Sequence, residues 1–120
     1  MNRLADYITV QLKQPFAWGT HDCICFVVGW VEIVTGIEHL QRYKPWSTER
    51  EAWHIIRKLG GMEIEFDKYL KRIPPNLAND GDITIVGKCA YIFSGRNIVS
   101  VATDGLIFKD RMEAKCAWSY

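Results

Sequence analysis

Cys23 is the residue with the clearest potential for chemistry, because it begins a predicted helix. The stretch 23–35 reads CICFVVGWVEIVT, with Asp22 before it and Gly36 after it. Asp is a favourable N-cap and Gly a favourable left-handed C-cap, and thirteen residues is long for the strand that the β-branched residues would also allow. We expect a helix that is apolar nearly all round and therefore buried. The helix dipole favours the thiolate form of a thiol in the first turn of a helix. Cys23 is therefore a candidate nucleophile, with its proton taken by a general base on a facing strand.

Two histidines and one aspartate are candidates to assist that thiol. His21 lies two residues before Cys23, too close along the chain for a base presented by a facing strand unless the loop folds back sharply, so it is a weak candidate base. His54 approaches the site only if the helix that carries it packs over the thiol. Asp82 is a weak candidate orienter of His21, and a turn at a strand start explains it equally well. The competing interpretation of Cys23 is a small buried side chain, because Asp22 beside it opposes thiolate formation.

The four cysteines of the chain, Cys23, Cys25, Cys89 and Cys116, are expected to be thiols. A chain of 120 residues can bury its own core, so disulfides are unnecessary in a reducing compartment. His21, Cys23 and Cys25 are separated by single residues, whereas zinc knuckles usually space their ligands by two to four residues. We therefore expect no metal and no cofactor.

Helical patterns fill the first part of the chain. Apolar residues recur at helical spacing over 3–12. Thr48 and Glu51 have the spacing of a capping box at the start of a second such pattern, which a glycine pair at 60–61 ends. A shorter pattern over 64–70 predicts a helix that continues until a proline pair ends it.

From residue 82 onward the pattern changes to short β-branched or aromatic runs, over 82–86, 89–93, 98–102 and 106–108. Within them, Asp104-Gly105 is a strong hairpin signal. Helices followed by closely spaced strands indicate an α+β domain, with N-terminal helices packed on a small antiparallel C-terminal sheet. We expect the whole chain, 1–120, to form this single domain.

Charge and hydropathy exclude several classes of partner. Fifteen Lys and Arg against 14 Asp and Glu give a net charge of +1, with the two signs interspersed, so charge identifies no nucleic-acid partner. The longest apolar run, 23–31, is far shorter than the roughly 20 residues of a membrane-spanning helix, so we expect no membrane insertion. Arg3 and Asp6 interrupt the apolar pattern of 1–10, so we expect no export signal.

The segment WGTHDCICFV, over 18–27, carries a more specific signal. Its tryptophan-glycine, aspartate-cysteine and phenylalanine-valine pairs resemble the signature of NlpC-type papain-like cysteine peptidases, which places Cys23 at the position of their nucleophile. GDI over 81–83 matches the opening of their first core strand, and CAYIFSG over 89–95 matches the next strand. In those enzymes the latter strand begins with the catalytic histidine, and here the position holds Cys89. The resemblance thus implies a papain-like fold without the expected base.

A phage-encoded branch of this superfamily, found among tail genes, resembles the chain more closely. The shared features are a glycine-x-histidine-aspartate-cysteine start over 19–23, glycine-leucine-x-phenylalanine over 105–108 and alanine-tryptophan at 117–118. Members of that branch tend to lack the strand histidine. The resemblance implies a structural protein of the phage tail tip, with other tail-tip or hub proteins as partners, located in the host cytoplasm during assembly and then in the virion. The alternative is a peptidoglycan endopeptidase that cuts a cell-wall peptide through a Cys23 acyl-enzyme, with His21 or His54 as an unorthodox base.

Overall fold

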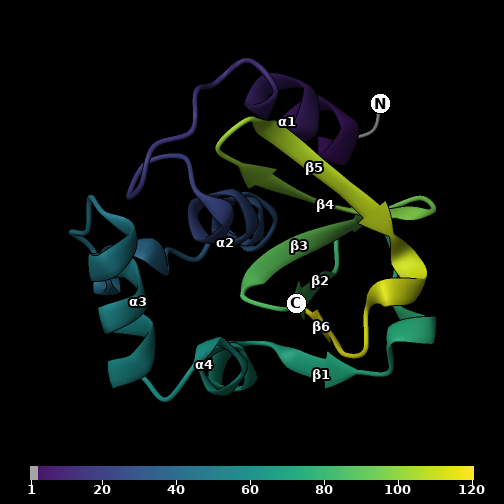
Figure 1. The fold of residues 1–120 in the computed structure, drawn as a ribbon. Coiled ribbons are helices and arrows are strands. Elements are labelled where there is room, and N and C mark those ends of the chain that lie inside the picture. Colours follow the sequence, from purple (N-terminus) through teal and green to yellow (C-terminus); the bar gives the residue numbers. More distant parts are fainter. Residues whose placement is uncertain (1–2) are drawn as a thin grey trace.

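Helix α2 (Cys23–Thr35) is the central element of the fold (Figure 1). Asp22 caps its N-terminus, where the Cys25 backbone N–H donates to the carboxylate at 2.8 Å, and Gly36 ends it in the left-handed region with φ 74°. The expected helix and both of its caps are confirmed. The computed structural model describes residues 3–120, so the first two residues of the segment in which we expect no export signal lie outside it.

Three further helices lie around α2 (Figure 1): α1 (Arg3–Gln11), α3 (Glu49–Lys58) and α4 (Met62–Tyr69). Thr48 caps α3 as expected, since its hydroxyl accepts the Glu51 backbone N–H at 3.1 Å. The Glu51 carboxylate accepts the backbone N–H of Ser47 at 2.9 Å and also interacts with the backbone N–H of Thr48, as a capping box requires.

The last helix ends earlier than the sequence predicts. Leu70 is already extended, with φ −129° and ψ 159°, and the chain continues as strand β1 (Lys71–Ile73) before it reaches Pro74. A residue that precedes a proline is held in the extended region, which favours this strand at Ile73. The proline pair therefore follows a strand and does not end a helix.

The sheet of the described residues has six antiparallel strands in the order β1-β6-β2-β3-β4-β5. The four strands that the sequence predicts are present: β2 (Ile83–Val86), β3 (Cys89–Ser94), β4 (Asn97–Ala102) and β5 (Gly105–Asp110). The hairpin predicted at Asp104-Gly105 is confirmed, since Ala102 pairs with Gly105. The α+β class, with helices preceding an antiparallel sheet, is likewise confirmed.

Two short strands, β1 and β6 (Ala117–Ser119), were not predicted. They pair with each other, and Trp118 of β6 also pairs with Ile83 of β2. Each has three residues, too few to show a period, and their pairing joins segments far apart in the chain. Their stability depends on tertiary contacts that local patterns do not record.

Both faces of the sheet are buried, by different means. One face packs on α2, where Ala90, Ile92 and Val99 join the main apolar core. On the other face, Tyr91, Phe93 and Ile98 form a second cluster, which Ala78 and Ala114 help to cover from irregular segments beside the short 3₁₀ helices η2 (Pro75–Leu77) and η3 (Arg111–Glu113). Strand β3 therefore directs alternate side chains to two distinct cores.

Trp118 joins the C-terminal strand to helix α4. Its side chain is fully buried, and its indole N–H donates to the Asp67 carboxylate at 2.9 Å. The ring packs edge-on against Phe66 with centroids 5.4 Å apart, and the Arg72 guanidinium lies 4.7 Å from the ring centre. One residue of the alanine-tryptophan pair thus fixes a helix and two strands together.

Trp118→Ala is expected to reduce the free energy of unfolding by about 3–5 kcal/mol, because it leaves a large cavity between α4 and the sheet. Trp53→Ala, at a half-buried position of α3, is the matched control and should cost about 1 kcal/mol or less. Urea unfolding followed by far-UV circular dichroism measures both. Equal losses in the two variants would contradict the anchoring role of Trp118.

Candidate functional site

The carboxylate of Asp22 organises the loop that leads into α2. It is fully buried and accepts three N–H groups, each at 2.8 Å: the backbone of Cys25, the backbone of Gly19 and the indole of Trp46. A buried carboxylate is stable only when such donors replace its water. Asp22 therefore joins the start of α2 to the preceding loop and to the segment that leads to α3.

Gly19 is required at the turn of this loop. Ala17 and His21 form an isolated antiparallel bridge around it, and Gly19 itself has φ 86°. A Cβ atom at Gly19 would lie 1.8 Å from the backbone oxygen of Trp46. The close approach of the Gly19 and Trp46 backbones explains the glycine of the tryptophan-glycine pair.

Cys23 and Cys89 bring their thiols together at the junction of α2 and the sheet. Cys23 is the first residue of α2 and Cys89 the first residue of β3, and both are partly buried. The two side chains are hydrogen-bonding partners, and the Cys23 sulfur also accepts from the backbone N–H of Ala90. The Cys89 sulfur lies 3.3 Å from the hydroxyl oxygen of Ser100 on β4. Two thiols and one hydroxyl thus form a cluster at the start of β3.

The proton of this pair belongs on Cys23. The contact with Cys89, followed by burial, raises the pKa of Cys23 well above its usual value, and the charge of Asp22 adds to this. Hydrogen bonds from Cys23, Ser100 and Tyr91 outweigh burial and lower the pKa of Cys89 to about 7. The sulfur that ionises first is thus the one on the strand and not the one on the helix.

The other candidate residues are not among the groups that shift the pKa of Cys23. His21 is buried, its ring donates to the backbone carbonyl of Gln11 at the end of α1, and burial lowers its pKa. His54 is exposed on α3. The Asp82 carboxylate accepts the backbone N–H of Asn79 at 2.8 Å, which is a turn at the entrance to β2. The groups that act on the Cys23 thiol are Cys89, Ala90 and Asp22.

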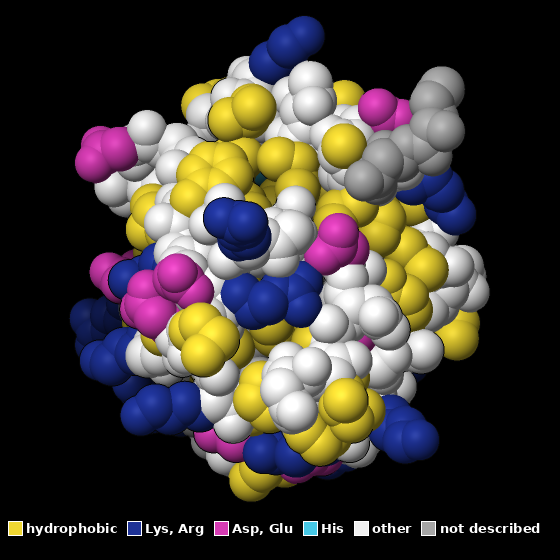
Figure 2. Space-filling model, turned by 90° about the vertical axis from the view of Figure 1, so that its right-hand side faces the viewer, with side chains coloured by type: hydrophobic (Ala, Val, Ile, Leu, Met, Phe, Trp, Pro, Cys, Tyr) yellow, Lys and Arg dark blue, Asp and Glu magenta, His cyan; other side chains and the backbone are white. Residues whose placement is uncertain are grey.

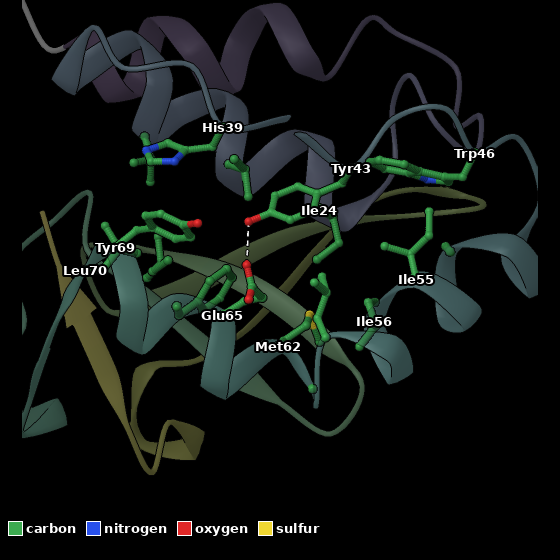
Figure 3. A pocket seen from close by; sticks show the side chains of 17 residues that line it. Ile24, His39, Tyr43, Trp46, Ile55, Ile56, Met62, Glu65, Tyr69 and Leu70 are labelled. Atoms are coloured by element: carbon green, nitrogen blue, oxygen red, sulfur yellow. Dashed lines mark hydrogen bonds between the residues drawn. The ribbon is translucent and has the colours of Figure 1, made fainter. Parts of the chain in front are cut away.

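Next to the site, a cavity of about 80 Å³ lies between α2, α3 and α4 (Figure 3). Its walls are mostly apolar, and its polar lining residues include His39, Tyr43 and Glu65. The Tyr43 hydroxyl points at the Glu65 carboxylate and donates to it at 2.5 Å. Lys68 holds the other oxygen of Glu65 at 2.7 Å. The volume is about half of the ~150 Å³ that holds a benzene molecule in an engineered cavity.

Hydrophobic, basic and acidic side chains are mixed on the face of the molecule that Figure 2 shows. Within residues 3–120, no three His, Cys, Asp or Glu side chains converge as metal ligands do. None of the described helices has the length and apolar character needed to cross a membrane.

Taken together, these features define an α+β domain in which a capped, buried helix presents a thiol to a second thiol on the sheet. The chain belongs to the family described as domain of unknown function DUF6950, whose model matches residues 1–120. Neither the comparison with curated proteins nor the comparison with solved structures found a match.

Sequence reasoning identified Cys23 and the strand position of Cys89 but did not foresee that their sulfurs interact. Ser100 and Trp46 were also missed. A single hydroxyl in an otherwise apolar strand could have identified Ser100 as a residue with a polar partner. The indole of Trp46 reaches Asp22 because of the path of a loop, which the sequence does not reveal.

Asp22→Asn is expected to reduce the free energy of unfolding by about 2–3 kcal/mol, because the amide loses the charge that three N–H donors share and places its own donors against them. Asp6→Asn, on the exposed side of α1, is the control and should change stability by less than about 0.5 kcal/mol. Thermal and urea unfolding measure both. If the unfolding midpoint of Asp22→Asn equals that of wild type, the hydrogen bonds of the Asp22 carboxylate do not stabilise the fold.

Glu65 gives a prediction about pH. Burial alone would raise its pKa, but the hydrogen bonds from Lys68 and Tyr43 outweigh burial and hold the pKa below its usual value. A carboxylate with a lowered folded-state pKa stabilises the fold above its unfolded-state pKa, and this stabilisation is lost as the pH falls through the folded-state value. Glu65→Gln should therefore be less stable than wild type at pH 7, with the difference narrowing between about pH 5 and 3.

Urea midpoints measured across that pH range test this, with the exposed Glu38→Gln as control. If the difference in urea midpoint between wild type and Glu65→Gln does not change with pH, then Lys68 and Tyr43 do not stabilise the ionised form of Glu65.

Proposed function

We propose that this chain is a structural component of a phage tail tip, in which an NlpC-type papain-like domain keeps its fold and has lost its hydrolytic chemistry. The proposal is supported by the contact between Cys23 and Cys89, because the resemblance to NlpC-type peptidases assigns the catalytic imidazole to the position of Cys89. The phage-tail assignment is supported by the motif resemblance at 19–23, 105–108 and 117–118.

Hydrolysis by Cys23 requires a base that takes its proton at neutral pH. Cys89 does not meet this requirement, since the pKa of Cys23 is raised while that of Cys89 is lowered to about 7, so proton transfer from Cys23 to Cys89 is uphill. The two histidines named as unorthodox bases are also unsuited, with the His21 ring bound to Gln11 and His54 exposed on α3. The peptidoglycan endopeptidase alternative therefore lacks an activated nucleophile.

What the domain retains is rigidity around the former nucleophile. Asp22, Gly19 and Trp46 hold the loop through buried hydrogen bonds and a backbone contact that admits no side chain. A rigid surface pays less ordering entropy on association, which suits a module that docks on hub proteins during assembly. The other tail-tip proteins are the partners in this proposal, and the virion is its final location.

The test places Cys23→Ser in the phage or prophage genome that encodes the chain, beside Gly19→Val, which forces a side chain into the backbone of Trp46. We expect Cys23→Ser to leave tail incorporation and infectious titre unchanged, because the thiol performs no hydrolysis. Gly19→Val should remove the protein from purified particles, as measured by mass spectrometry, and reduce the titre.

The enzyme alternative gives a different pattern. A working nucleophile would lose peptidase activity by several orders of magnitude in Cys23→Ser. Particles of Cys23→Ser that assemble normally but fail to infect, together with release of peptide fragments from muropeptides by the wild-type protein alone, would overturn the structural proposal.

A further inference from the structure

We infer that Cys23 and Cys89 are a redox-reactive pair that a small-molecule disulfide, such as oxidised glutathione, converts into an intramolecular disulfide between α2 and β3. The inference stands on the contact between the side chains of Cys23, the first residue of α2, and Cys89, the first residue of β3, with the Ser100 hydroxyl 3.3 Å from the Cys89 sulfur. It does not depend on the tail assignment.

The surroundings give the two sulfurs different roles. Cys89 has three donors near its sulfur, from Cys23, Ser100 and Tyr91, and these stabilise a thiolate. Burial and the nearby thiols raise the pKa of Tyr91 to about 12, so its hydroxyl keeps the proton that it donates. Cys89 is therefore the attacking thiol, since the thiolate is the nucleophile in disulfide exchange.

The first step transfers one glutathionyl group. The Cys89 thiolate attacks one sulfur of oxidised glutathione, a bond forms between Cys89 and that sulfur, and the glutathione S–S bond breaks to release one glutathione thiolate, which takes a proton from water. The Cys89 sulfur is then part of a mixed disulfide and is no longer a thiolate.

The second step closes the ring. The contact with Cys89 is the largest cause of the raised pKa of Cys23, so loss of the Cys89 charge favours ionisation of Cys23 at the N-terminus of α2. The Cys23 thiolate attacks the Cys89 sulfur and displaces the second glutathione. In the balance, two protein thiols lose two electrons and two protons, and one oxidised glutathione becomes two reduced molecules.

The other two cysteines serve as internal controls. Cys25 points from the same helix into the core, and burial beside Asp22 raises its pKa to about 12. Cys116 lies in the segment before β6 and belongs to the margin of the main core. Neither is placed beside the Cys23–Cys89 pair in the way that Ser100 is.

The disulfide would fasten the start of α2 to the sheet and close a loop that contains α3, α4 and β2. A crosslink across a long loop stabilises a fold mainly by restricting the unfolded chain. We expect the oxidised protein to unfold about 5–10 °C above the reduced protein, with the difference abolished by a reducing agent.

The experiment incubates the reduced full-length protein with oxidised glutathione at pH 8, blocks remaining thiols with iodoacetamide and maps the peptides by mass spectrometry. We expect a Cys23–Cys89 linkage in wild type, and in Cys25→Ser and Cys116→Ser as well. Cys23→Ser should instead accumulate a mixed disulfide at Cys89, because it lacks the resolving thiol. Cys23→Ala repeats this measurement in case the serine variant folds poorly.

Three outcomes would overturn the inference: a mixed disulfide at Cys89 that persists in wild type, a linkage that uses Cys25 or Cys116, or an oxidised form no more stable than the reduced one. Because the assay uses purified protein and a small-molecule oxidant, its failure leaves the tail proposal untouched. Conversely, failure of the phage experiment leaves the thiol chemistry in place.

Discussion

The buried carboxylate of Asp22 is the interaction on which the rest of the site depends. It accepts N–H groups from the loop before α2, from the first turn of α2 and from Trp46, so three stretches of chain meet at one charge. This arrangement caps the apolar helix and leaves its first residue at the surface of the core. Gly19 allows the loop backbone to pass close to Trp46, where a Cβ atom would lie 1.8 Å from the backbone oxygen.

The same carboxylate limits what Cys23 is able to do. A helix N-terminus favours a thiolate, whereas a neighbouring negative charge and a neighbouring thiol that ionises first disfavour it. At this site the unfavourable influences prevail, so the pKa of Cys23 is raised, and Cys89 on the strand is the thiol that ionises first. The site thus holds a pair of thiols in contact, and exchange with disulfides is a reaction open to such a pair.

The sequence predicted the helices and the four longer strands because their signals are local. Asp22 and Gly36 cap α2 as expected, and Asp104-Gly105 forms its hairpin. The strands β1 and β6 escaped prediction because their pairing joins segments far apart in the chain, and α4 was predicted too long because the chain enters β1 two residues after the helix ends. At the site, the motif located Cys23 and Cys89, but their mutual pKa shifts depend on Ser100 and Tyr91, which only the folded sheet brings near.

The central claim is that the strand thiol, and not the helix thiol, is the one that ionises near neutral pH. The most direct measurement is the rate of alkylation at each cysteine against pH, with limiting iodoacetamide and quantification by peptide mass spectrometry. The account predicts that Cys89 reacts with a midpoint of about 7, while Cys23 stays slow until well above the value of about 8.5 of a free cysteine. A midpoint for Cys23 below that of a free cysteine, with Cys89 still protonated, would contradict it and restore Cys23 as an activated nucleophile.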